Sequence, residues 1–113
     1  MPYAINGQDT SLSEPDLQDG TLWVPLRGVV ETLGGSVDWD PDNRVAIANL
    51  GANMITLQEG DLTADIDGEK TELQSAPHLK DGEMWVPVRF FNLVGQQVSV
   101  DLQSKQVDIT SVA

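Results

Sequence analysis

The sequence predicts an α+β protein made of two repeated units, in each of which short antiparallel β-hairpins pack on one short α-helix. Three observations lead to this class. The segment "TLWVPLRGVVETLGG" at 21–35 recurs as "EMWVPVRFFNLVGQQ" at 83–97, sixty-two residues further along. Asn-Gly and Asp-Gly pairs, which favour hairpin turns, stand between strand-like runs. Each Trp-Val-Pro segment is followed by an apolar, helix-like run.

The repeat spans nearly the whole chain. Residues 3–48 form the first repeat and residues 54–110 the second, within a single domain that covers residues 1–113. Matching residues lie sixty-one or sixty-two positions apart, for example Asn6-Gly7 and Asp67-Gly68, Asp19-Gly20 and Asp81-Gly82, or Trp23 and Trp85. The spacing between matching residues changes by one within each unit, and this change falls in turns, which tolerate the insertion of a residue.

Each unit is expected to open with a β-hairpin. The pairs Asn6-Gly7 and Asp67-Gly68 follow strand-like runs at 3–5 and 62–66. Both central positions of a type I′ turn need positive φ, which Asn, Asp and Gly adopt more easily than other residues. A second Asp-Gly turn then leads into a short apolar strand, at 22–24 in the first unit and at 84–86 in the second.

A helix is predicted to start at each proline. Pro25 and Pro87 suit the first helical position, because their fixed φ is helical and their missing N–H has no partner there anyway. In the first unit Gly34-Gly35 provides a left-handed helix end. One apolar stripe at helical spacing precedes it, formed by Leu26, Val29, Val30 and Leu33.

The second helix is apolar around most of its circumference, so it must be covered on more than one side. The first helix contains Arg27-Gly28 and Glu31-Thr32, whereas the second contains Phe90-Phe91 and Leu93-Val94. Phe90 and Leu93 are therefore the candidate interface residues. We expect this helix to lie between the two sheets or to contact a partner, with a second copy of the chain as one option.

A further hairpin should follow each helix. Strand-like runs at 37–39 and 45–47 flank the turn "DPDNR", and runs at 98–100 and 107–109 flank "DLQSK". Between the units, residues 54–66 contain two alternating segments that turn at Glu59-Gly60. The expected total is about ten short strands and two short helices.

The composition excludes several classes of partner. Eighteen acidic and six basic residues give a formal net charge of −12, which repels phosphate backbones and anionic lipid surfaces, so no nucleic acid is expected to bind. No apolar run approaches the roughly eighteen residues that span a bilayer, which predicts no membrane insertion. The absence of cysteine excludes disulfides and thiolate metal sites. The sequence shows no signal peptide, so the protein is either cytoplasmic or exported with its signal peptide removed.

The order of these motifs resembles the copper amine oxidase-like N-terminal domain family, also called the stalk domain. The resemblance rests on the Asn-Gly or Asp-Gly hairpin, the loop that ends in Asp-Gly, the W-V-P-x-R segment that opens a helix ending in Leu-Gly, and "VDWDPDNRVAI" at 37–47. It covers nearly the whole chain. Residues 54–110 match one complete unit, and residues 3–48 match a unit without its leading strands, which the tail of the chain or a partner would supply.

The resemblance implies an antiparallel sheet wrapped on a helix, repeated as tandem modules in secreted and envelope-attached bacterial proteins. It therefore implies an extracellular or envelope location with the signal peptide removed. In the amine oxidases this module is a non-catalytic stalk, and the metal and the quinone cofactor belong to another domain. No catalytic residue and no cofactor carry over to this chain.

One stretch resembles a calcium loop. Asp38, Asp40 and Asp42 follow the alternation with which such a loop begins. The sixth position is Asn43 instead of glycine, and the twelfth is Asn49 instead of glutamate. A hairpin turn with solvated carboxylates is the favoured interpretation, and a weak calcium site is the alternative. A copper or zinc site would need carboxylates as well, because the chain has a single histidine, His78.

The W-V-P-x-R segments are interpreted as structural joints. Exposed tryptophans could stack on sugars, but all three tryptophans of this chain, including Trp39, lie in strand-like apolar runs where burial is the ordinary explanation. Two identically placed arginines could bind an anion, but in a chain of charge −12 a partner within the chain is favoured. The residues assigned to the joints are Trp23, Pro25, Arg27, Trp85, Pro87 and Arg89.

The sequence thus predicts a non-enzymatic secreted or cell-envelope module of the stalk type that mediates attachment or protein–protein assembly. Its partner is an envelope component or another protein, and it needs no cofactor. Two alternatives remain. One is an accessory domain that binds copper or calcium, and the other is a module that binds cell-wall glycan through a tryptophan.

Overall fold

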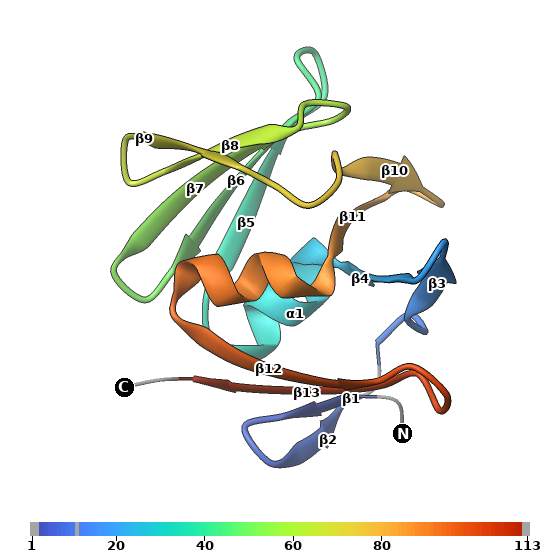
Figure 1. The fold of residues 1–113 in the computed structure, drawn as a ribbon. Helices are drawn as coiled ribbons and strands as arrows, with labels where there is room; N and C mark the ends of the chain where they lie inside the picture. The colour runs from blue at the N-terminus through green and yellow to red at the C-terminus, as the bar shows by residue number, and fades with distance from the viewer. Residues whose placement is uncertain (1–2, 11, 112–113) are drawn as a thin grey trace.

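The computed structural model describes residues 3–10 and 12–111, which contain thirteen strands and two helical segments (Figure 1). The first half comprises β1 (Tyr3–Ile5), β2 (Gln8–Thr10), β3 (Asp16–Gln18), β4 (Thr21–Pro25), α1 (Leu26–Thr32), β5 (Ser36–Asp40) and β6 (Val45–Leu50). The second half comprises β7 (Asn53–Gln58), β8 (Thr63–Ile66), β9 (Glu69–Glu72), β10 (His78–Lys80), β11 (Glu83–Pro87), the 3₁₀ helix η1 (Val88–Val94), β12 (Gln96–Asp101) and β13 (Gln106–Ser111).

The predicted α+β class is wrong, because the protein is mostly β. The described strands form three sheets, in the orders β12-β13-β1-β2, β10-β11-β4-β3 and β5-β6-β7-β8-β9. The two helical segments have only seven residues each and lie between these sheets (Figure 1). The strand count was too low because β2, β3 and β10 have three residues each, too few for an alternating pattern to show.

The Asn-Gly and Asp-Gly pairs form two-residue hairpin turns, as predicted. Asn6 and Gly7 have φ values of 53° and 79°, and Ile5 pairs with Gln8 across this turn. The three Asp-Gly pairs have the same positive φ signs and join β3 to β4, β8 to β9 and β10 to β11. Positive φ at both central residues matches the twist of the strands on either side of each turn.

Strands from both predicted units share each sheet. β1 pairs in parallel with β13, with Tyr3 opposite Val107 and Ile5 opposite Ile109. It is therefore the tail of the chain that extends the sheet of the first hairpin. In the five-stranded sheet, β7 lies between β6 of the first half and β8 of the second.

The β4–β11 pair lies at the middle of the second sheet. Val24 pairs with Val86, Trp23 with Pro87, and Pro25 with Trp85. The pairing is thus symmetric about Val24 and Val86, because each residue and its equivalent sixty-two positions later occupy matching places in the two strands. Sixty-two residues is also the spacing on which the two-unit interpretation rests. The division into two units itself stays a prediction.

Both helical segments begin one residue later than predicted. Pro25 and Pro87 end β4 and β11 with extended backbone, at ψ 125° and 138°, and the helices start at Leu26 and Val88. The fixed φ of proline near −65° fits an extended strand as well as a helix, so its ring alone does not decide on which side of the boundary it falls.

The second helical segment is a 3₁₀ helix, whereas an α-helix was predicted. Its buried residues include Val88, Phe91 and Val94, which are spaced by three and fall on one face of a helix with three residues per turn. Phe90 is also buried, and Gly95 ends the segment in the left-handed conformation at φ 81°. An apolar run alone does not distinguish the two helix types.

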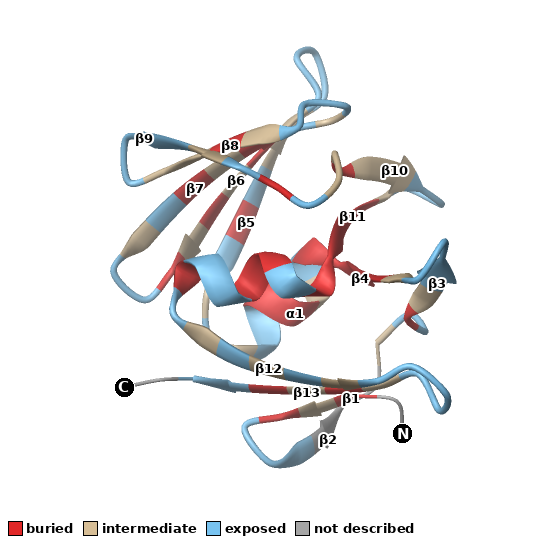
Figure 2. Cartoon of the chain, in the orientation of Figure 1, coloured by how far each residue is buried: buried red, intermediate tan, exposed pale blue. Residues whose placement is uncertain are grey.

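The core lies where the helical segments meet the sheets. Figure 2 shows buried residues concentrated in β4, β11, α1 and η1, whereas the hairpin turns around them are exposed. α1 buries Leu26, Val29 and Val30, as its apolar stripe predicts. Tyr3 and Phe91 are among the largest fully buried side chains.

Replacing Gly35 by alanine should destabilise the protein strongly. A Cβ atom at Gly35 would overlap the backbone carbonyl oxygen of Asn49 and crowd the side chain of Val30. We expect Gly35→Ala to lower the free energy of unfolding by about 1–3 kcal/mol or more, as overpacking does. Gly28→Ala is the matched control, because its Cβ would meet only the flexible end of Leu12, and alanine gains helix propensity. Urea denaturation measures both, and equal effects would contradict the packing argument.

Tyr3 should ionise only when the protein unfolds. Its hydroxyl donates a hydrogen bond to the carbonyl oxygen of Ser13 at 2.7 Å. Burial, followed by the negative charges of Glu83 and Glu14, raises the pKa of Tyr3 far above its ordinary value. The native state therefore favours the neutral phenol, so the stability that Tyr3 contributes is present below pH ~10 and is lost as the pH rises above it.

Because Tyr3 is the one tyrosine of the chain, tyrosinate absorbance reports on it alone. In an alkaline titration, this absorbance should appear together with the loss of near-ultraviolet circular dichroism. Tyr3→Phe should move alkaline unfolding to higher pH. A tyrosinate signal with a midpoint near pH ~10 in a protein with native circular dichroism would contradict the expectation.

Candidate functional site

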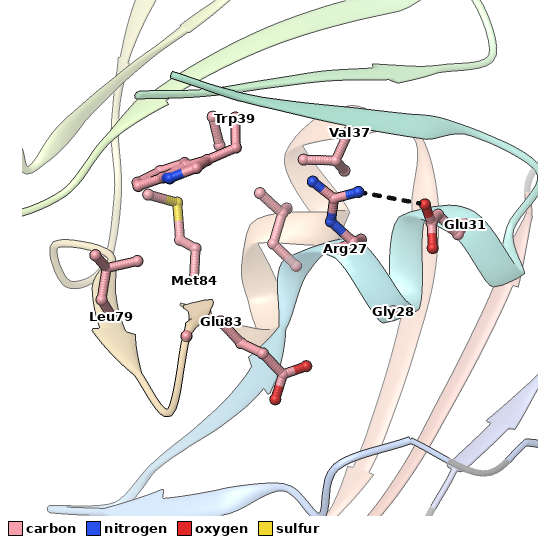
Figure 3. Close-up of a pocket in the computed structure, with 11 residues that line it drawn as sticks. Arg27, Gly28, Glu31, Val37, Trp39, Leu79, Glu83 and Met84 are labelled. Carbon is pink, nitrogen blue, oxygen red and sulfur yellow. Dashed lines mark ion pairs between the residues drawn. The ribbon is translucent and has the colours of Figure 1, made fainter. Parts of the chain in front are cut away.

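A surface cavity of about 410 Å³ lies between α1, the edge strand β5 with its neighbour β6, and the β10–β11 hairpin (Figure 3). We call it the groove. Its apolar wall is formed by Leu26, Val37, Trp39, Ala46, Leu79 and Met84. Charged side chains stand beside this wall, with Arg27 and Glu31 coming from α1 and Glu83 from β11. The groove therefore combines apolar surface with charges of both signs.

The alternation of β5 aims two side chains at the groove. Val37 is buried and Trp39 is half-buried, whereas Ser36 and Asp38, which alternate with them along the strand, are exposed on the opposite face. Trp39 pairs across the sheet with Ala46, which also lines the groove. Because alanine is small, it leaves space beside the indole ring.

The opposite wall of the groove is attached to the five-stranded sheet by Glu59. Its carboxylate accepts a hydrogen bond from Nη1 of Arg44 at 2.6 Å and another from the backbone N–H of Leu79 at 3.3 Å. The hydrogen bond from Arg44, with that of Leu79, holds the pKa of Glu59 below its usual value. The carboxylate thus remains charged in mildly acidic solution and keeps β10 next to the turn after β7.

The charges at the groove are solvated. Nη1 of Arg27 lies 3.8 Å from the Glu31 carboxylate, as their four-residue spacing predicts, and both side chains are 53% exposed. Such an exposed pair contributes roughly 0.5 kcal/mol or less, so a ligand can compete for either partner. Glu83 accepts a hydrogen bond from the Ser13 hydroxyl at 2.8 Å.

A smaller cavity of about 170 Å³ lies next to η1 and is lined by Arg89. Several of its lining residues lie sixty-one or sixty-two positions from residues that line the groove, namely Gly20, Thr21, Leu22, Val88, Arg89 and Val100. Arg89 is exposed and forms no ion pair within the described ranges 3–10 and 12–111. The two arginines of the W-V-P-x-R segments thus each line a cavity.

A comparison with family models identifies the chain. The model described as copper amine oxidase N-terminal domain matches residues 4–109. The chain belongs to this family. The motif-based resemblance is thereby confirmed.

A curated protein that is similar to this chain is named "Protease inhibitor" and comes from Brevibacillus choshinensis. The two sequences are 31% identical over 93 residues. That match covers 81% of this chain but 28% of the relative, so the chain spans less than a third of the relative's length.

The described residues of this copper amine oxidase N-terminal domain do not fit a copper ion. The ring of His78 stacks at a tilt on Trp23, with 4.4 Å between the ring centroids. The described residues include no group of three His, Cys, Asp or Glu side chains that could hold a metal ion. The family's name therefore does not assign copper chemistry to this chain.

The three aspartates of the calcium-like stretch are not brought together as a metal site. Both carboxylate oxygens of Asp40 are engaged in the turn, where they accept hydrogen bonds from the backbone N–H groups of Asp42 and Asn43 and from the Asn43 side chain. The hydrogen bonds from Asn43 hold the pKa of Asp40 below its usual range. Asp38 points outward from β5 and Asp42 is exposed.

The other tryptophans do not face the groove. Trp23 is 7% exposed and Trp85 is 3% exposed, and Nε1 of Trp85 donates a hydrogen bond to the carbonyl oxygen of Lys80 at 3.2 Å. The Lys80 ammonium lies 5.1 Å from the centroid of the Trp85 ring. A glycan-binding interpretation would therefore rest on Trp39.

The two candidate interface residues lie in different surroundings. Phe90 is 3% exposed and packs edge-on against Phe91, with 5.1 Å between ring centroids, so the chain's own core covers it. Leu93 is 44% exposed. An interface at Leu93 stays a prediction. Among the helices of the described residues, none has the length and apolarity required to cross a membrane.

Sequence reasoning missed the groove as a site. Trp39 was interpreted as buried within the strand-like run at 37–39, so no cavity was expected beside it. Leu79, Glu83 and Met84 carry no local signal that links them to β5, because they are about forty residues away and meet it only in the folded chain. The smaller cavity at Arg89 was hidden for the same reason.

Fluorescence quenching should show that Trp39 is the accessible tryptophan. A neutral quencher such as acrylamide should reach Trp39 in the groove and leave the buried Trp23 and Trp85 largely unquenched. Trp39→Phe should therefore remove most of the quenching. Caesium should quench better than iodide, because Asp38 and Asp40 on β5 repel anions. Unchanged quenching of Trp39→Phe would contradict the described groove.

Proposed function

We propose that this domain is a non-enzymatic module of a longer secreted or envelope protein, and that it binds another protein through the groove. The observation that carries the proposal is the pairing, in one open cavity, of apolar residues such as Trp39 and Met84 with solvated charged residues. Protein interfaces combine an apolar centre with a polar rim in this way. The family assignment supports a role as an accessory domain.

An extended segment of the partner is the proposed occupant of the groove. A hollow of about 410 Å³ is at the lower end of the range for small-ligand pockets and accepts a few side chains. The net charge of −12 favours a partner surface with basic residues. The location proposed for this binding is the cell envelope or the extracellular space, as the family resemblance implies.

Protease binding is a second candidate, and the name of the Brevibacillus relative favours it. The match to that protein covers most of this chain, so the aligned region is a candidate for the part that contacts a protease. An inhibitor is also a non-enzymatic protein-binding module, and this candidate differs from the first only in the class of partner.

Co-sedimentation with envelopes from the producing organism tests the first candidate. Wild-type protein should bind saturably, and Trp39→Ala should bind at least about tenfold more weakly, because it removes a large aromatic contact from the groove. Leu62→Ala is the control, since Leu62 is 44% exposed and does not line the groove. EDTA should leave binding unchanged, because Asp40 is engaged in its turn. Equal binding by wild type and Trp39→Ala, with both folded, would exclude the groove.

Steady-state assays against trypsin, subtilisin, papain and thermolysin test the second candidate. Stoichiometric inhibition of one of them by wild type, weakened in Trp39→Ala and kept in Leu62→Ala, would identify a protease as the partner. Inhibition unaffected by Trp39→Ala would place the inhibitory contact elsewhere. Absence of inhibition in all four assays would leave envelope attachment as the function to test.

A further inference from the structure

Among the strands that the structure describes, β5 has a neighbour along only one of its two edges. It is the first strand of the five-stranded sheet, and its pairing to β6 runs from Ser36 opposite Asn49 to Asp40 opposite Val45. An edge strand presents backbone N–H and C=O groups to which another extended chain can pair. With five residues, β5 is longer than the edge strands β2, β3, β9 and β10 and one residue shorter than the edge strand β12.

The free edge of β5 adjoins the groove. Val37 and Trp39 of β5 line the groove, while α1 and the β10–β11 hairpin form its other walls (Figure 3). Side chains of neighbouring strands lie in rows on the same face of a sheet. A segment paired to β5 would therefore send every second side chain into the groove beside Trp39.

The other face of such a segment would lie beside carboxylates. Asp38 is exposed on the outer face of β5, and Asp40 follows it at the end of the strand. The carboxylate of Asp38 has no hydrogen bond or ion pair among the described residues, so it can pair with an incoming cation. Opposite charges on facing residues of neighbouring strands stabilise their pairing. Glu31 and Glu83 at the groove add negative charge near the same edge.

We infer that the partner adds an extended segment to the free edge of β5, with apolar side chains in the groove and basic side chains alternating with them beside Asp38 and Asp40. This inference rests on the proposed function, because it names the binding mode and the partner chemistry for the same groove. Strand addition would draw affinity from backbone hydrogen bonds and specificity from the alternating side chains. It also gives Asp38 a role that does not require calcium.

The test uses a synthetic nonapeptide that alternates lysine and valine, titrated into the purified full chain by isothermal calorimetry. Binding should be saturable and should weaken as the salt concentration rises. A peptide that alternates glutamate and valine keeps the apolar pattern but should bind at least about tenfold more weakly, because it meets a chain of charge −12. Equal binding of the two peptides would overturn the charge assignment.

Backbone methylation tests whether the segment pairs as a strand. In one peptide the N–H groups of the odd residues are methylated, and in another those of the even residues. Strand addition requires that one of the two lose binding and the other keep it, because only alternate N–H groups face the neighbouring strand. Hydrogen exchange should then show new protection of alternate β5 amides. Binding by both methylated peptides, or by neither, would overturn strand addition.

Two charge variants of the protein complete the test. Asp38→Lys should weaken peptide binding by about tenfold, because an attractive facing pair becomes a repulsive one. Asp42→Lys makes the same charge change at an exposed position beyond the strand and should keep the affinity within about twofold. Both side chains are exposed, so folding should survive, and thermal melts check this. Equal effects of the two substitutions would overturn the pairing at Asp38.

The outcomes separate the two proposals. If the peptides fail to bind but Trp39→Ala abolishes envelope binding, the groove remains the binding site and strand addition is wrong. If the peptides bind as described but envelope binding is indifferent to Trp39→Ala, the binding mode exists while the envelope function is wrong.

Discussion

The pairing of β4 with β11 is the constraint on which the rest of the structure depends. Val24 and Val86 face each other across this pair, and both are fully buried. Each strand ends at a proline that stands opposite a tryptophan of the other strand. Because proline cannot donate to a ladder and each strand continues directly into a helical segment, the pair is short and both helices start from the centre of the molecule.

The groove is a consequence of this arrangement. α1 leaves the central sheet at Pro25 and packs on the five-stranded sheet, while the β10–β11 hairpin stays with the central sheet. Space remains where the edge of one sheet passes the hairpin of the other. The small side chain of Ala46 on β6 leaves space in the groove, and Glu59 ties the hairpin to the larger sheet. The site is therefore built at a boundary between two sheets.

The local elements could be predicted better than their assembly. Asn6-Gly7 and the Asp-Gly pairs determine hairpins because few other residues accept two consecutive positive φ values. The 3₁₀ form of η1 was not predictable from its apolar run, because it depends on how Val88, Phe91 and Val94 are buried when η1 packs on β12 and β4. The overall class was wrong because the polar strands β3 and β10 have no pattern of their own and are strands only through pairing with β4 and β11.

By itself, the sequence determined the turns, the two helix starts to within a residue, the buried face of α1 and the family of the chain, since each depends on residues that are neighbours along the backbone. The tertiary structure alone decided that β1 pairs with β13, that the core covers Phe90, and that Trp39 shares a groove with Leu79 and Met84. These features depend on contacts between residues far apart in the chain. Such contacts depend on the burial of side chains and the pairing of strands over the whole chain at once. No local sequence pattern encodes that outcome.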